Sequence, residues 1–432
     1  MAKTLKTWAT LGVAILGSAG VAAAAPVLQQ SHSNPLFHLT DGEGGEGAAP
    51  AEGGEGGEGG EGGEGGEGGG STVETYKLES SDANAFAYDA KAQVEAYAKH
   101  VYESYEAAED GAKALKAAVA ALLDKPDADT LKAARAAWVK ARPAYLKTET
   151  FRFYDGPIED VEGEINAWPM NEAYIDYVQG DDKAGLINNS KEPITAESLT
   201  AANQKSDEAD VTTGWHAIEF LLWGQDLSAT GPGDRPATDF VAGQGNNDRR
   251  REFLSVVTDK LVDDLEGLEQ AWAPDKADNY RAKFVALDQR EALGRIINGM
   301  AVLAGFEFMS ERLAVALDSG DQEDEHSCFS DTTKQDFVYD LEGIREVWAK
   351  TGLSQLVASR DEATAKKVTA LLLDAEVKIA KLGDPWDQVL AAAKDSQPRK
   401  DAEAVVASLQ ALADGIKEAG NKLGVLVLIP SG

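Results

Sequence analysis

The chain has 432 residues, 43% of them hydrophobic, which is enough apolar material for about two globular domains. Its formal net charge of −33 argues against nucleic acid as a partner, because phosphates require a basic surface, and favours cations, metal ions included. The single cysteine, Cys328, excludes an intrachain disulfide.

The first 25 residues have the pattern of a secretory signal. Two lysines precede an apolar run over residues 8–21, and small residues follow at Ala23 and Ala25. The run is short for an uncleaved membrane anchor, and no later stretch of the sequence is apolar enough to span a bilayer. We therefore expect an exported protein, periplasmic or associated with the cell envelope, with at most peripheral membrane contact.

Residues 26–71 form a Gly/Glu-rich segment with nine acidic residues and no lysine or arginine. Glycine is costly to order and the glutamates repel one another, so the pattern predicts a disordered, extended tether that acts as a spacer. The chain beyond it is also acidic, with 65 acidic against 39 basic residues.

From about residue 82 the hydrophobic pattern is helical, and long strand-like alternation is absent. The predicted helices cover residues 83–123, a second segment from Asp127 or Asp129 towards Phe153 with a kink at Pro143, and then 211–224, 248–272, 277–317, 332–350, 361–382 and 399–423. Residues 155–210 are less regular, and so long an irregular stretch in a helical protein usually folds over a functional site.

This layout predicts an all-α protein with two helical bundles of about four helices each. We place the first bundle at residues 72–245 and the second at 246–432, with the boundary in a loop rich in Gly, Pro and Asp. The similar content of the two halves suggests a duplication.

One helix carries a Gly214-x-His216-x-x-Glu219 motif in an apolar run from residue 211 to 224. His216 and Glu219 lie one turn apart on the same face, while the opposite face is apolar, so the helix is expected to be buried. A buried carboxylate needs a partner. A metal ion held by both side chains and a simple His–Glu hydrogen bond are both compatible with this spacing.

Other acidic residues are candidates to complete such a site. Glu149 and Asp155 flank an Arg-containing segment, where a solvated charge pair is the alternative. Glu307 is an acid within a strongly apolar helix and could face a central site or the outside.

A second mixed segment runs from Glu323 to Asp331. It brings His326 and Cys328 close together in sequence, but no orienting partner for a nucleophile can be named. His326 is therefore a weaker metal-ligand candidate, and a purely structural turn remains open.

Several blocks, in order, resemble the imelysin family. They are the motif helix, residues 148–158, residues 165–176 and residues 325–331. The resemblance covers about residues 75–423 and implies an exported, two-bundle helical protein with His216 and Glu219 as metal ligands and Glu149 as the nearest further acid. It implies no firm role for Asp155, Glu307 or His326, and the Gly/Glu-rich tether is not part of the family pattern.

The resemblance also implies a connection with iron uptake, and the family was first classed as metallopeptidases. We expect a metal-binding protein that holds a divalent or ferric ion, iron favoured and zinc possible, with an envelope permease or receptor as a possible partner. A metallopeptidase with Glu219 as the catalytic residue is the first alternative, although no complete hydrolytic site is visible. An adhesion or interaction module without metal is the second.

Overall fold

A computed structural model describes residues 76–80 and 85–430. The predicted signal and the Gly/Glu-rich tether lie outside these residues. Within the described ranges the all-α prediction is confirmed, since the only strands are β1 (Tyr76–Leu78) and β2 (Val425–Val427), which pair antiparallel. None of the helices in these ranges has both the length and the apolar character needed to cross a bilayer.

The helices follow one another with short 3-10 turns between them. The first half contains α1 (Lys91–Asp124), α2 (Ala128–Leu146), η2 (Glu149–Phe151), α3 (Glu162–Ile165), α4 (Glu172–Ile175), η3 (Leu186–Asn188), α5 (Ala196–Ala202), α6 (Gly214–Trp223) and η4 (Ala237–Phe240). The second half contains α7 (Asn247–Trp272), α8 (Tyr280–Val285), α9 (Gln289–Val302), η5 (Leu303–Ala314), α10 (Val315–Ser319), η6 (Gln322–Asp324), η7 (Cys328–Ser330), α11 (Thr333–Lys350), α12 (Leu353–Arg360), α13 (Glu362–Ile379), α14 (Asp387–Leu390) and α15 (Gln397–Lys422).

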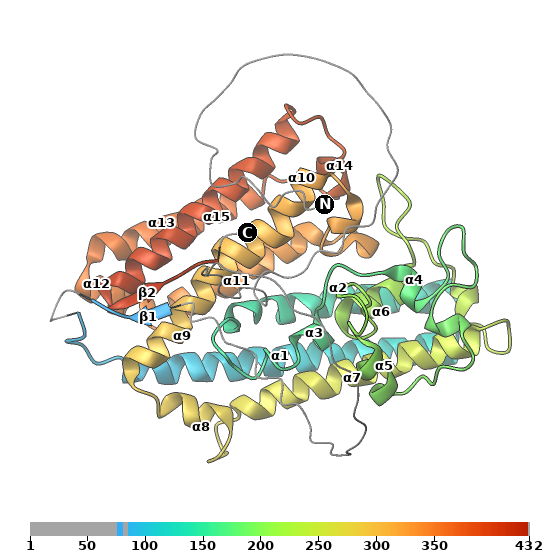
Figure 1. Cartoon of the computed structure of the whole chain (residues 1–432), viewed down its shortest axis with the longest axis horizontal. Helices are drawn as coiled ribbons and strands as arrows, with labels where there is room; N and C mark the ends of the chain where they lie inside the picture. The colour runs from blue at the N-terminus through green and yellow to red at the C-terminus, as the bar shows by residue number, and fades with distance from the viewer. Residues whose placement is uncertain (1–75, 81–84, 431–432) are drawn as a thin grey trace, which may run out of the picture.

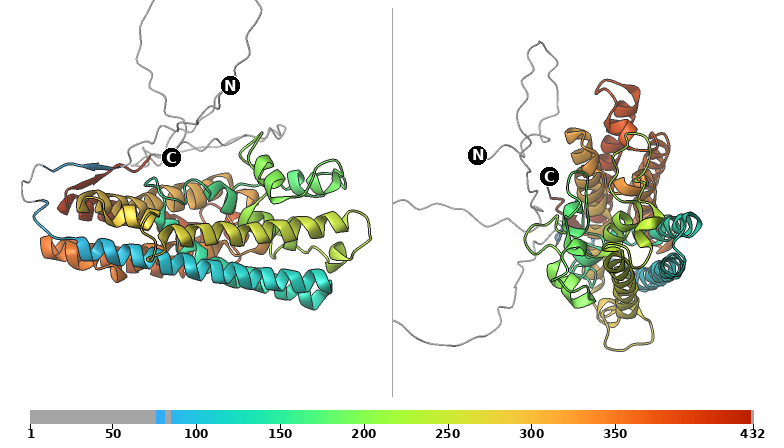
Figure 2. Two further views of the ribbon diagram at one scale, coloured as in Figure 1. Left: turned by 90° about the horizontal axis from the view of Figure 1, so that it is seen from below. Right: turned by 90° about the vertical axis from the view of Figure 1, so that its right-hand side faces the viewer.

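The first group of helices consists of α1, α2, α6 and α7. Helices α1 and α7 run side by side along the long axis of the molecule (Figures 1 and 2), and α2 packs on α1. Helix α2 begins at Asp127, whose side chain accepts from the backbone N–H groups of Asp129 and Thr130. It continues through Pro143 and ends at Leu146, short of the predicted end near Phe153.

The second group is built on α9, η5, α11, α13 and α15. Helix α15 packs against α13, α9 and η5, on the side of the molecule away from α1 and α7 (Figure 1). Helix α11 joins the groups by packing on α2, and one continuous apolar core runs through both. The domain boundary at residues 245/246 stays a prediction, and α7, which follows it, packs mainly on α1 and α6.

The helix expected over residues 277–317 is divided into several pieces. Asp288 starts a new helix at α9 by accepting from the N–H of Arg290. The following segment, η5, is a π-helix, a form that is rare and often lies at functional sites. It carries Glu307 and Arg312, so this change of helix type sets where two buried charges point.

A buried histidine cluster as the candidate functional site

Helix α6 is buried along its whole length of ten residues. It packs on α2, α7 and η7, and the irregular segment before it, through α3, covers its N-terminal end. Gly214 opens the helix with a φ of +82°, and a Cβ there would lie 2.3 Å from the carbonyl oxygen of Ile165. The glycine of the motif is therefore required by the backbone conformation and by the close approach of α3.

His216 and Glu219 contact each other within α6, and both are fully buried. The Nδ1 atom of His216 lies 2.9 Å from Oε2 of Glu219. The other oxygen of Glu219 accepts from Ser330, at 2.9 Å from its backbone N–H and 2.6 Å from its hydroxyl. Burial raises the pKa of Glu219 to about 8, against the opposing effects of the Arg142 charge and the Ser330 hydrogen bonds.

Arg142, from α2, stands against the other nitrogen of His216. Its Nη2 lies 3.1 Å from His216 Nε2 and 3.0 Å from Oδ2 of Asp336, and its Nη1 donates to Asn166 at 2.9 Å. A guanidinium only donates, so Nε2 of His216 accepts and Nδ1 carries the proton that faces Glu219. Burial, and then the charge of Arg142, hold the pKa of His216 well below its ordinary value, so this imidazole is neutral.

His326 lies beside His216, with ring centroids 4.9 Å apart, and its Nδ1 also faces a carboxylate. Its Nδ1 lies 2.7 Å from Oδ2 of Asp336, which also accepts from the Ser327 hydroxyl at 2.7 Å. Burial and Arg312 lower the pKa of His326 to about 4. Burial opposes ionisation of Asp336, yet Arg142 and His326 together hold its pKa below the ordinary value. We call His216, Glu219, His326, Asp336 and Arg142 the histidine cluster.

The donor chemistry of the histidine cluster fits a metal ion. Two neutral imidazoles are each held at Nδ1 by a carboxylate, and this is how metal-binding histidines are usually oriented. The position faced by His216 Nε2 and the Asp336 carboxylate holds the Arg142 guanidinium, at contacts of 3.1 and 3.0 Å. Metal–ligand bonds to nitrogen and oxygen are about 2.0–2.2 Å. An ion at this position would therefore have to replace Arg142.

A second buried group, which we call the arginine cluster, lies between the two helix groups. Its members are four carboxyl groups and two guanidinium groups, from Glu149, Glu162, Glu307, Asp340, Arg152 and Arg312. Two cations balance only two carboxylates, so the four carboxyl groups differ in their tendency to ionise. Burial raises the pKa of Glu162 to about 7 and that of Asp340 to about 8, whereas Arg152 and Arg312 overcome burial to lower that of Glu149.

The predicted site residues thus separate into three places. His216 and Glu219 meet in the histidine cluster, and His326 joins them there. Glu149 and Glu307 face the two arginines. Asp155 is exposed at the surface, and no metal-binding group of described residues includes it. Metal binding by these residues remains a prediction.

Arg142, Asp336 and Ser330 were missed by reasoning from sequence. Arg142 lies on the buried stripe of α2 with Trp138 and Tyr145, and a charge on an apolar stripe was the available signal. Asp336 lies 194 positions after Arg142 in the chain, and Ser330 lies 111 positions after Glu219.

Comparison with known proteins decides the family. The imelysin family model matches residues 101–416, most of the chain. The chain belongs to the imelysin family. It is 24% identical over 257 residues to Iron-regulated protein A of Synechococcus elongatus, a match that covers 57% of this chain and 61% of that protein. The chain thus matches less than two thirds of the length of this curated relative.

Two solved structures share the fold. One is a putative iron-regulated protein A precursor from Parabacteroides distasonis, at 14% identity and a TM-score of 0.63, covering 77% of this chain and 94% of that one. The other is an imelysin-like protein from Psychrobacter arcticum, at 16% identity and a TM-score of 0.57, covering 76% and 94%. The resemblance inferred from the sequence blocks is confirmed, and these imelysin relatives connect the chain with proteins named for regulation by iron.

Proposed function

We propose that this imelysin-family protein is a non-catalytic metal-binding protein that handles iron at the cell envelope. The observation that carries the proposal is the pair of neutral imidazoles, His216 and His326, each held at Nδ1 by a carboxylate. A neutral imidazole is the form that binds metals. The name of the Synechococcus relative supports iron as the favoured ion, and zinc suits the same donors.

His216 would bind the ion through Nε2, with Asp336 as the nearest further donor once Arg142 has moved. His326, whose Nδ1 faces Asp336, would contribute through Nε2. Glu219 would orient His216, because one of its oxygens already accepts from His216 and the other accepts from Ser330. In this proposal the ion is the cargo of the protein. Glu149, Asp155 and Glu307 remain weaker candidates, because the described contacts place none of them on His216.

The test is metal binding by the purified full chain, measured by elemental analysis after loading with iron or zinc. His216→Ala is expected to abolish binding, while Glu219→Gln weakens it by roughly 10–100-fold, the usual loss when an orienting partner of a ligand is removed. His100→Ala is the control, since His100 lies in α1, where it faces Glu346 outside the cluster. Unchanged metal stoichiometry in His216→Ala would refute the proposal.

A metallopeptidase is the second candidate, and the pKa of Glu219 near 8 suits a general acid or base at neutral pH. The reaction also needs a cleft that admits substrate. His216 and Glu219 are fully buried, and the surface cavities beside α1 and at the end of α6 are lined by other residues. Chelator-sensitive peptide cleavage that disappears in Glu219→Gln would establish this alternative instead.

Export, location and partner belong to the same proposal. The basic and apolar start of the chain supports export, and the acidic body supports a role with cations. An envelope iron-uptake permease or receptor is the expected partner, to be sought by crosslinking in iron-starved cells. If the His–Glu pair were only a core hydrogen bond in an interaction module, the histidine cluster would bind no iron or zinc, and either ion would raise the Tm of the unsubstituted chain no more than that of His216→Ala.

A further inference from the structure

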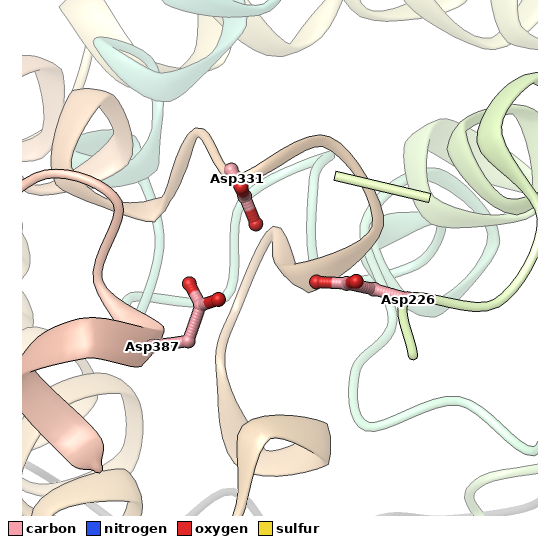
Figure 3. Close-up of side chains that lie close together, drawn as sticks. All are labelled: Asp226, Asp331 and Asp387. Atoms are coloured by element: carbon pink, nitrogen blue, oxygen red, sulfur yellow. The ribbon is translucent and has the colours of Figure 1, made fainter. Parts of the chain in front are cut away.

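Three aspartates from distant parts of the sequence come together beside η7. Asp226 follows α6, Asp331 follows η7 and Asp387 begins α14. One carboxylate oxygen from each lies within 4.8 Å of the others, and Figure 3 shows the three carboxyl groups around a common space. Among the described residues this is the one set of three or more acidic, histidine or cysteine side chains whose ligand atoms already lie this close together. We call it the aspartate cluster.

Asp387 is the least exposed member, and its surroundings leave its charge uncompensated. Its side chain is 3% exposed, and neither carboxylate oxygen has a hydrogen-bond partner in the described chain. Figure 3 shows this carboxylate directed towards the space that Asp331 and Asp226 also face. One oxygen of Asp331 is likewise buried without a partner. Burying an ionised carboxylate without a partner is costly, so a bound cation or proton is required here.

The neighbouring side chains do not supply that positive charge. In the described part of the chain, the salt bridges to lysine or arginine include none of the three aspartates. Asp226 accepts from the backbone N–H of Ser228 at 2.9 Å and from the Gln322 amide, both neutral donors. Burial, and then the neighbouring carboxyls, raise the pKa of Asp331 to about 7, the direction expected for carboxyl groups gathered without a cation.

The chemistry of the aspartate cluster selects the kind of cation. Ligand atoms that are all carboxylate oxygens favour hard cations. Calcium accepts oxygen ligands at about 2.3–2.6 Å, so two of its ligands can lie up to about 5 Å apart, whereas magnesium requires a tighter octahedron. The three ligand oxygens lie within 4.8 Å of one another, inside the limit for calcium ligands, and the variable geometry of calcium suits carboxylates from three separate segments. Asp226 also lines a surface cavity of about 490 Å³, so this member of the cluster lies at the edge of solvent-accessible space.

We propose that Asp226, Asp331 and Asp387 bind a hard divalent cation, calcium being the best match, at a site separate from the histidine cluster. The bound ion joins the end of α6, the turn after η7 and the start of α14. Ser330, the last residue of η7 and the neighbour of Asp331, donates to Glu219. The cation site therefore fixes the segment that completes the histidine cluster, without depending on metal binding there.

The experiment is calorimetric titration of the chelator-treated full chain with calcium at pH 8, repeated with magnesium and manganese. We expect one site that is lost, or weakened at least tenfold, in Asp387→Asn. Asp384→Asn is the matched control, because Asp384 is exposed, lies three positions away and stands outside the cluster. The Gly/Glu-rich tether is present in every variant, so any weak binding to it cancels in the comparison.

Two further variants keep the outcome decisive. Asp331→Asn tests the site if Asp387→Asn fails to fold, since asparagine tolerates the positive φ of +57° at this position. His216→Ala should retain calcium binding, which separates this proposal from the one for the histidine cluster. Tighter binding of magnesium or manganese that is lost in Asp387→Asn supports a hard-cation site. The proposal is overturned if none of the three ions binds, or if ion binding is unchanged in both Asp387→Asn and Asp331→Asn.

Discussion

Replacement of Gly214 by alanine tests how α6 is held in place. The residue has a φ of +82°, which costs an L-residue roughly 1–2 kcal/mol. The new Cβ would also lie 2.3 Å from the carbonyl oxygen of Ile165, and relieving such an overlap typically costs about 1–3 kcal/mol. Because the obstacle is backbone of α3, it cannot rotate away. The expected loss in the free energy of unfolding is about 2–5 kcal/mol.

Two other glycines separate the cost of the positive φ from the cost of the close contact with α3. Gly243 has a φ of +75° and open space around it, so Gly243→Ala should lose only the conformational cost, about 1–2 kcal/mol. Gly267, in the exposed face of α7, has neither constraint, and Gly267→Ala should gain about 0.5–1 kcal/mol from better helix propensity.

The assay is urea unfolding of the three variants and the unsubstituted chain, followed by circular dichroism in the presence of chelator. The expected order of stability is Gly267→Ala, then the unsubstituted chain, then Gly243→Ala, with Gly214→Ala last. If Gly214→Ala and Gly243→Ala lose equal stability, the close contact between α3 and α6 is not a constraint and the reasoning fails.

Three further predictions concern buried charge. Arg142→Met leaves Asp336 buried without its cation and should cost about 3–5 kcal/mol in urea unfolding; a cost below 1 kcal/mol would contradict the ion pair. The pKa of Asp340 is about 8 in the folded chain, which is above its value in the unfolded chain. The contribution of this carboxyl group to the free energy of unfolding is therefore present at low pH and is lost as the pH rises from about 4 to 8, by up to about 1.4 kcal/mol per pH unit. Asp340→Asn should flatten the decline between pH 5 and 8, and an equal slope in both proteins would refute the assignment. Burial raises the pKa of the Cys328 thiol well above its usual range, so a thiol reagent at pH 8 should label the chain only after unfolding; rapid labelling of the folded chain would contradict this.

Local patterns predicted the helices well, because periodicity and caps act over a few residues. The complete burial of α6 followed from its apolar faces, and the start of α2 followed from Asp127. The break between α8 and α9 was not predicted, and neither was the change to a π-helix at Leu303, since the π-helix keeps an apolar pattern typical of one continuous helix.

The composition of the candidate site could be predicted only in part. The His216–Glu219 pair is local to one helix, whereas Arg142 and Asp336 are 194 positions apart and meet only through the packing of α2, α6 and α11. The aspartate cluster also brings together residues that are far apart in the sequence. Asp226 and Asp387 each resemble a solvated loop acid in sequence, and only the tertiary fold shows that they face a common space.

Metal binding at His216 is tested most directly by the iron and zinc content of the chain purified from its native host, alongside His216→Ala and Asp387→Asn. We predict a bound ion in the unsubstituted chain and in Asp387→Asn, and none in His216→Ala. Full metal content in His216→Ala, with loss in Asp387→Asn, would place the cargo at the aspartate cluster and contradict the assignment to the histidine cluster.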